Sequence, residues 1–240
     1  MKKLNVFFFK KYIVNLAILA MVVIVGLAVA FGINFNSNDT QTSAGQGAIY
    51  QGNTSSKNIS LMINVYWGTE YLGDMLQTLE EKGVKATFFI GGVWAADNQE
   101  LIIKMAEKGH EIGNHAYSHK DHDKLTRESC LKEISTTHNL IKSIIGKEMN
   151  LFAPPSGAYN AQTVDCAKQL GYKTIMWTRD TVDWRDQDEK LIYNRAINKA
   201  AGGDLILMHP TKATRDALGK IIDTLQGQGY SLVTVSETLA

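Results

Sequence analysis

The stretch ISLMINVYWG, from Ile59 to Gly68, indicates the fold. Its largely apolar run ends at a glycine, which is typical of a buried strand that enters a tight turn. A single amide, Asn64, lies among the apolar residues near the end of the strand. A strand that is apolar on both faces belongs to a parallel sheet covered by helices, so the stretch predicts an α/β protein.

Similar runs recur along the chain: KATFFIG, HEIGNH, NLFAPP, YKTIMWT, DLILMHP and YSLVTVS. Helical patterns lie between them, the first with apolar residues at i, i+3, i+4 and i+7: Leu72, Met75, Leu76 and Leu79. Asp97, with Glu100 three residues on, predicts a capping box at the start of the next helix. About seven strand–helix units predict a distorted (β/α) barrel, in which functional residues lie at the C-terminal ends of the strands.

The N-terminal part of the chain has a different composition. Lysines precede an apolar run at residues 12–33, which is long enough for one transmembrane helix, with the N-terminus in the cytoplasm and the rest outside. A cleavable signal peptide is the alternative, because residues 28–30 read AVA, and the protein would then be secreted. We therefore expect a stub and anchor at 1–33, a flexible Asn/Ser/Thr/Gln/Gly linker at 34–57 and a folded domain at 58–240.

Composition excludes several classes of protein. The chain is 45% hydrophobic and 20% charged with a formal net charge of +1, which fits one globular core and indicates neither disorder nor nucleic-acid binding. Its two cysteines, Cys130 and Cys166, form neither a disulfide framework nor a metal-type cluster in the sequence.

Unusual polar residues follow the predicted strands: Asn64, His115, His119, Ser156, Asp180, Asp183 and His209. Two histidines spaced by four, as in NHAYSH, can reach one divalent ion from the same side of a turn. Asn64 has an alternative interpretation as an amide that satisfies backbone groups, and His209 as a histidine that caps a strand end. The aromatic rings of Trp67, Trp177 and Trp184 either line a sugar-binding groove or belong to the core.

The motifs resemble the polysaccharide deacetylases, that is the NodB-homology proteins or carbohydrate esterase family four. HAYSH is similar to the zinc motif H-[ST]-x-x-H, with Ala116 after the first histidine. ATFFIGG, GHEIGNH, APPSGAYN, DTVDW and LILMHP resemble further motifs of the family in the same order. The similarity runs from Ile59 to the C-terminus, and the family's fold is a distorted (β/α) barrel. The altered first and third motifs suggest a divergent sporulation-type branch.

The resemblance implies a role for each matching residue. His115 and His119 would bind a divalent metal, expected to be zinc and expected to bind weakly. Active members end the first strand with Thr-Phe-Asp-Asp-Gly, and alignment of the strand ends places Asn64 at the catalytic base and Val65 at the third metal ligand. Neither side chain can perform these roles, because an amide does not take a proton near neutral pH and valine has no donor atom.

Three further inferences come from the same resemblance. Ala153 stands where the family has an arginine beside the catalytic aspartate, so the base and its positive partner are lost together. His209 would be the general acid, with Asp183 holding its protonated form. The residues expected to bind substrate are Trp67, Pro155, Ser156, Tyr159 and Trp184.

Two functions follow as hypotheses. In the first, the protein is a membrane-tethered hydrolase that removes N-acetyl groups from an envelope polysaccharide such as peptidoglycan, with low activity. In the second, it is a pseudoenzyme that binds glycan without chemistry. In both, the expected partners are an envelope polysaccharide and, through residues 12–33, the lipid bilayer.

Overall fold

A computed structural model describes residues 47–240 of the chain. The predicted transmembrane segment at residues 12–33 lies outside the described residues, as does the linker up to residue 46. Between residues 47 and 240, no helix has both the length and the apolar character needed to cross a bilayer.

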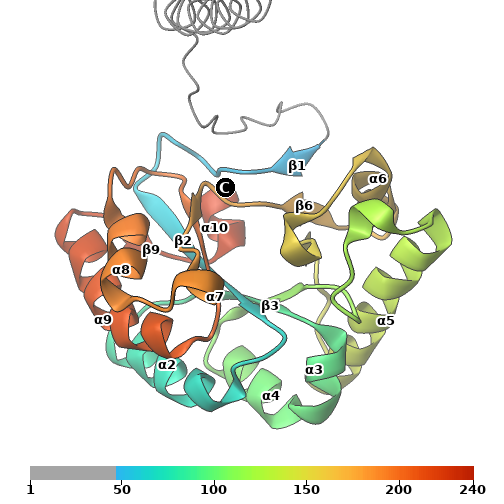
Figure 1. Ribbon diagram of the computed structural model, residues 1–240, viewed down its shortest axis with the longest axis horizontal. Helices are drawn as coiled ribbons and strands as arrows, with labels where there is room; N and C mark the ends of the chain where they lie inside the picture. Colours follow the sequence, from blue (N-terminus) through green and yellow to red (C-terminus); the bar gives the residue numbers. More distant parts are fainter. Residues whose placement is uncertain (1–46) are drawn as a thin grey trace, which may run out of the picture. The chain divides into compact units, whose positions relative to one another are not determined.

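All strand pairings in the described residues are parallel and form one curled sheet (Figure 1). The strands are β1 (Ala48–Ile49), β2 (Asn58–Val65), β3 (Thr87–Ile90), β4 (Glu111–Asn114), β5 (Leu151–Phe152), β6 (Lys173–Ile175), β7 (Arg179–Asp180), β8 (Leu205–Met208) and β9 (Ser231–Leu232). Their order is β1-β6-β5-β4-β3-β2-β8-β7, and β9 pairs with β2. β1 and β7 are the two ends of this order. The sheet therefore curls like a barrel that is not closed by hydrogen bonds between β1 and β7.

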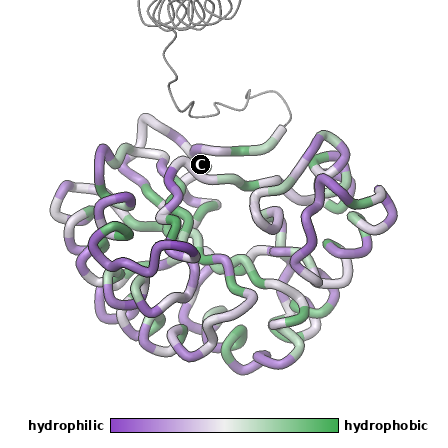
Figure 2. The backbone as a smooth tube through the Cα atoms, viewed as in Figure 1, coloured by the Kyte–Doolittle hydropathy of each residue, from purple (hydrophilic) through white to green (hydrophobic). Residues whose placement is uncertain are grey.

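Most helices lie around the outside of the curled sheet, whereas α10 (Val235–Leu239) lies within its curve beside β2, where Val235 packs in an inner apolar cluster (Figure 1). The other helices are α2 (Thr69–Glu81), α3 (Gly92–Asp97), α4 (Gln99–Glu107), α5 (Arg127–Ile145), α6 (Ala161–Gln169), α7 (Asp183–Asp186), α8 (Glu189–Ile197) and α9 (Lys212–Gly227). The central strands are coloured as hydrophobic in Figure 2, and much of the outer chain is hydrophilic. The observed parallel α/β fold therefore agrees with the predicted barrel type.

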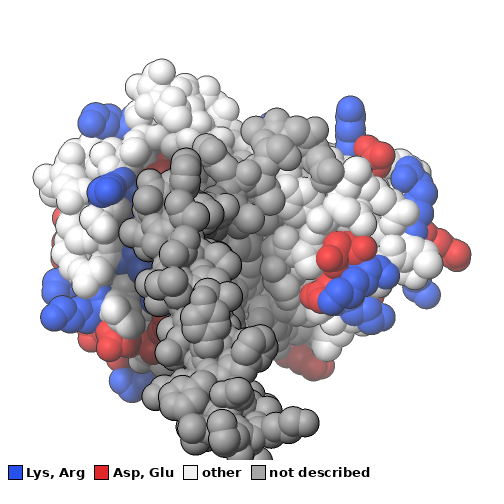
Figure 3. Space-filling model, turned by 45° about the horizontal axis from the view of Figure 1, so that its top comes forward, with Lys and Arg blue, Asp and Glu red and all other residues white. Residues whose placement is uncertain are grey.

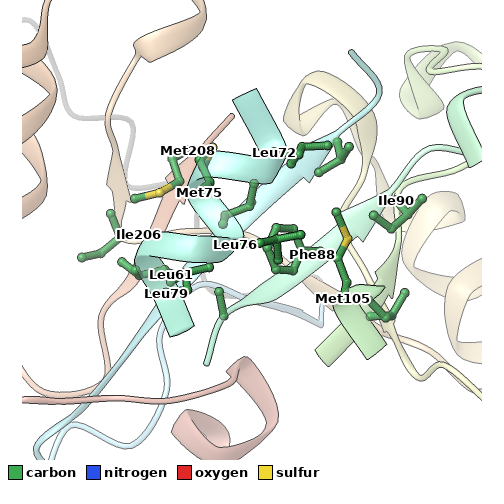
Figure 4. Close-up of a cluster of buried hydrophobic side chains, with 14 of the residues drawn as sticks. Leu61, Leu72, Met75, Leu76, Leu79, Phe88, Ile90, Met105, Ile206 and Met208 are labelled. Carbon is green, nitrogen blue, oxygen red and sulfur yellow. The ribbon is translucent and has the colours of Figure 1, made fainter. Parts of the chain in front are cut away.

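The alternation of side chains along β2 separates two apolar clusters. Ile63 and Val65 belong to the outer cluster, which packs between the sheet and the helices, whereas Met62 belongs to a smaller inner cluster. Figure 4 shows part of the outer cluster, with α2 side chains packed on β2, β3 and β8. Each fully buried Leu, Ile or Met of this kind stabilises the fold by about 1.5–3 kcal/mol. Residues 62, 64 and 66 of this chain segment consequently face the inside of the barrel.

The predicted helix at Leu72 to Leu79 is confirmed, since these apolar residues are the buried face of α2. The predicted capping box at Asp97 and Glu100 is wrong. Asp97 is the last residue of α3, and α4 begins after Asn98, which makes no side-chain cap. Asp97 lies at the C-terminal end of α3, just before α4 begins. The spacing of residues in the sequence does not reveal that one helix ends there before the next one starts.

The folded domain also begins earlier than residue 58. β1 pairs with β6, and the backbone N–H of Gly52 donates to the carbonyl of Gly203 at 2.8 Å. The hydroxyls of Tyr50 and Tyr159 are hydrogen-bonded at 2.7 Å. The last ten residues of the expected linker 34–57 are thus part of the sheet and its edge, because their backbone groups find partners far along the chain.

Candidate functional site

A cleft of about 300 Å³ opens at the C-terminal ends of the central strands. It is lined by Asn64, Tyr66, His115, His119, Ser156, Gly157, Trp177, Asp180, Trp184, Leu207 and His209. The polar residues that follow separate strands in the sequence are therefore neighbours in space, as the geometry of a parallel barrel requires.

The two histidines of the H-x-x-x-H pair lie at the floor of the cleft. Their ring centroids are 5.1 Å apart. His115 is fully buried, and its Nδ1 contacts the carbonyl oxygen of Ala153 at 2.7 Å, so Nδ1 carries the proton and Nε2 has a free lone pair. Burial disfavours the imidazolium ion, which lowers the pKa of His115 well below its ordinary value and also lowers the pKa of His119.

Glu133 of α5 determines the shape of the turn between these histidines. Its carboxylate accepts hydrogen bonds from the backbone N–H groups of Tyr117 and Ser118, at 3.0 and 2.6 Å, and from the Ser118 hydroxyl at 2.7 Å. Ala116 and His119 have φ values of 59° and 54°, a region that costs non-glycine residues energy. The buried carboxylate therefore holds the histidine turn in a conformation that it would not adopt alone. Glu133 could not be identified from the motif, because only the packing of α5 brings its carboxylate to the histidine turn.

Tyr66 occupies the space beside the histidines. Its ring stacks on that of His119 with centroids 3.6 Å apart, and lies 5.8 Å from the ring of His115. Val65, which the alignment of strand ends placed at the third metal ligand, is fully buried in the outer cluster instead. That placement is wrong, because successive side chains of a strand point to opposite faces.

Side chains along β2 point alternately into and out of the barrel. This alternation favours an alignment of residues 64–68 with the family motif Thr-Phe-Asp-Asp-Gly that contains no gap. Matching Gly68 to the final glycine of Thr-Phe-Asp-Asp-Gly puts Asn64 at the threonine and Val65 at the outward phenylalanine. Tyr66 and Trp67 then stand at the two aspartates. Asn64 faces the cleft, 3% exposed, and its Oδ1 has no hydrogen-bond partner. The same alternation, applied to the sequence, would have identified Tyr66.

His209 and Asp183 form a buried pair, and the His209 ring lies 6.4 Å from that of Tyr66 between centroids. Nδ1 of His209 lies 2.8 Å from Oδ1 of Asp183, and the His209 backbone N–H donates to Oδ2 at 2.6 Å. Thr214 also donates its hydroxyl to Oδ2, at 2.5 Å. Val182, a β-branched residue with φ of 53°, directly precedes Asp183, so the pair is built on strained backbone.

Asp180 supplies the carboxylate that lines the cleft. It accepts a hydrogen bond from the backbone N–H of Val182 at 2.8 Å. Burial raises its pKa above the ordinary value, because a carboxylate loses solvation there.

The residues expected to bind substrate have different surroundings. Ser156 and Trp184 line the cleft, and Trp184 is 53% exposed. The Trp67 ring lies parallel to that of His209 with centroids 6.2 Å apart. Pro155 is buried beneath the loop, and the Tyr159 hydroxyl bonds to Tyr50 near β1 rather than lining the cleft.

The side chains present do not fit a family-type metal centre. The two imidazoles lie edge to face, and Tyr66 rather than a carboxylate stacks on one of them. Among residues 47–240, no group of three or more His, Cys, Asp or Glu residues is arranged to hold a metal ion. Ala153 packs in the inner apolar cluster, so the position of the family's arginine is uncharged as well.

A parallel, curled α/β sheet with a histidine pair and a His–Asp pair at its C-terminal edge defines a class of barrel hydrolases and their inactive relatives. Residues 51–175, more than half of the chain, match the sequence profile of the family described as polysaccharide deacetylase. The chain belongs to this family.

Two curated relatives come from Bacillus subtilis (strain 168). The chain is 31% identical to the peptidoglycan-N-acetylmuramic acid deacetylase PdaA, over 80% of this chain and 75% of PdaA. It is 41% identical to the uncharacterized protein YlxY, over 80% of this chain, and spans 60% of the length of YlxY.

Solved structures of a Bacillus anthracis protein have the same fold. The wild-type protein BA3943, described as a CE4 family pseudoenzyme, matches with a TM-score of 0.79 and 35% identity, over 81% of this chain and 69% of that chain. A mutant of BA3943 described as having restored enzymatic activity matches with a TM-score of 0.79 and 33% identity, over 81% and 72% of the two chains.

Proposed function

We propose that the domain binds an amino-sugar glycan of the cell envelope in its cleft and deacetylates that glycan slowly or not at all. The observation that carries the proposal is the Tyr66 ring stacked on His119, 3.6 Å between centroids, where the family has a carboxylate. Tyr66 offers no carboxylate to take a proton from water, and the amide of Asn64 beside it has no proton affinity near neutral pH.

The cleft itself supports binding. Trp177 and Trp184 line it, and the apolar faces of such rings pack against the apolar faces of sugar rings. Trp184 is exposed, so its ring is accessible to a sugar bound in the cleft.

Low deacetylase activity is the second candidate function, and one observation favours it. The His209–Asp183 pair is intact, so a proton held on His209 Nε2 could be given to a departing amine as water cleaves the amide to acetate and amine. A general acid alone is not sufficient, because a general base must also take a proton from the attacking water. Asp180 is the carboxylate in the cleft that could act as this base.

The proposed location is the outer face of a cell membrane, with residues 12–33 as the anchor. An outward-facing domain on such a tether meets peptidoglycan, and relatives named as peptidoglycan deacetylases support this choice of polymer. If the apolar run were instead cleaved as a signal peptide, the domain would be secreted into the same surroundings.

The test measures binding and chemistry on the same preparation. The purified full chain is titrated calorimetrically with amino-sugar oligomers and with soluble peptidoglycan fragments, and acetate release is assayed in parallel with added Zn²⁺. We expect saturable binding with acetate release at or near background. Trp184→Ala should weaken binding about tenfold, which corresponds to about 1.4 kcal/mol.

Ile103→Ala is the matched control, because Ile103 is an exposed apolar residue of α4 that does not line the cleft. It should bind like the wild type. Absence of binding to every oligomer would refute the proposal, and rapid acetate release would replace it by the deacetylase function.

A further inference from the structure

Two residues that line the cleft each have a buried polar atom without a hydrogen-bond partner: Oδ1 of Asn64 and Nε2 of His115. Asn64 is 3% exposed and His115 is fully buried. Because Nδ1 of His115 donates to the Ala153 carbonyl, its Nε2 is an acceptor, and the amide oxygen of Asn64 is an acceptor too. A buried acceptor left unsatisfied costs about 1–3 kcal/mol, so the site calls for a ligand that donates hydrogen bonds.

The charge of the residues that line the cleft also favours a ligand that donates hydrogen bonds. Asp180 contributes a carboxylate, and no Lys or Arg is among the residues of 47–240 that line the cleft. His209, which also lines the cleft, is paired with the carboxylate of Asp183. Lys and Arg lie beside Asp and Glu around the edges of the face drawn in Figure 3, whereas the lining of the cleft contains a carboxylate without Lys or Arg.

Aromatic rings complete this environment. Tyr66, Trp177 and Trp184 line the same cleft, and ring faces carry negative electrostatic potential that attracts cations. A metal dication is a poor match, as the donor set described above indicates. A protonated primary amine is a good match, because it has three N–H donors, one positive charge and no acceptor.

We infer that the cleft receives the free ammonium group of a de-N-acetylated amino sugar, so that the domain recognises glycan which has already lost acetyl groups. An N-acetyl group offers one N–H donor and a carbonyl oxygen, and that oxygen would face the acceptors of Asn64 and His115. An ammonium brings N–H donors for such acceptors and a positive charge for the Asp180 carboxylate. The inference rests on the proposed function, because it specifies which form of the glycan the cleft binds.

The experiment compares three ligands of equal length on the full chain: oligomers of glucosamine, of N-acetylglucosamine and of glucose. It is run at a pH at which the amine is protonated and at fixed moderate salt. We expect the glucosamine oligomer to bind at least tenfold more tightly than the N-acetylglucosamine oligomer. Asp180→Asn should reduce this preference to threefold or less, and Asn64→Leu should reduce it as well, while Ile103→Ala leaves it unchanged.

The outcomes separate the two proposals. Equal or tighter binding of the N-acetylglucosamine oligomer would overturn the inference and leave the proposed function intact. Failure of all three oligomers to bind would refute the proposed function itself. A glucosamine preference that survives in the isosteric Asp180→Asn variant would also overturn the inference, because the amine would then be attracted by carboxylates elsewhere on the surface.

Discussion

Removal of the Asp183 carboxylate should destabilise the domain more than removal of an exposed one. Asp183 is fully buried and accepts three hydrogen bonds, two from His209 and one from Thr214, at 2.5–2.8 Å. Asp183→Ala leaves these donors without a partner in a site that water does not reach. Deleting one member of a buried pair costs about 3–5 kcal/mol, and we expect that loss in the free energy of unfolding. Asp183→Asn keeps one acceptor oxygen and should lose less, about 1–3 kcal/mol.

Equilibrium unfolding in urea measures both variants against the wild type, with the midpoint expected to fall at an unchanged slope. Asp97→Ala is the control, because Asp97 is exposed at the end of α3, and its effect should lie within about 0.5 kcal/mol. If Asp183→Ala lost less than about 1 kcal/mol, the three hydrogen bonds would only offset the desolvation of the carboxylate. The argument that this pair stabilises its strained loop would then be wrong.

Three other outcomes are expected. Tyr66→Asp combined with Trp67→Asp should raise acetate release from N-acetylglucosamine oligomers, with Zn²⁺ supplied, by roughly 10²-fold or more, whereas Asn64→Asp alone should not. If Asn64→Asp raised acetate release and the double variant did not, the original alignment of the strand ends would be correct. Glu133→Gln should destabilise the domain. Burial alone would raise the pKa of Glu133, but the hydrogen bonds from Ser118 and Tyr117 to the carboxylate outweigh burial and lower the pKa below the ordinary value of 4.5. The stabilisation by this carboxylate is therefore complete above pH 4.5 and is lost as the pH falls through the lowered pKa. The difference in unfolding free energy between wild type and variant should therefore shrink in acid, and a difference independent of pH would contradict this assignment. Fractionation of cells should release the protein from membranes only with detergent, and a mature N-terminus at or after residue 31 would instead identify residues 12–33 as part of a cleaved signal.

The fold was largely predictable because its strands and helices have strong local patterns. β2 is eight residues long and the buried face of α2 has regular helical spacing, so both could be identified in isolation. β1 could not, because two residues in a polar stretch become a strand only through pairing with β6, more than a hundred residues away.

The site was predictable in its location but not in its details. His115 and His209 follow strong strands, and a parallel barrel gathers strand ends. The freedom in aligning a strand end assigned to Asn64 and Val65 the roles of base and metal ligand, whose positions, two residues further on, are those of Tyr66 and Trp67. The support from Glu133 is invisible in the motif, because helix packing alone brings α5 to the histidine turn.

The alternation of β2 gives its two faces separate roles. Outward residues such as Ile63 and Val65 pack with the helices and hold most of the apolar burial. Inward residues such as Asn64 and Tyr66 face an open cleft and contribute little to that packing. Substitutions can therefore accumulate on the inner face while the fold keeps its stability. An enzyme with this fold can become a binding protein and remain folded at every step.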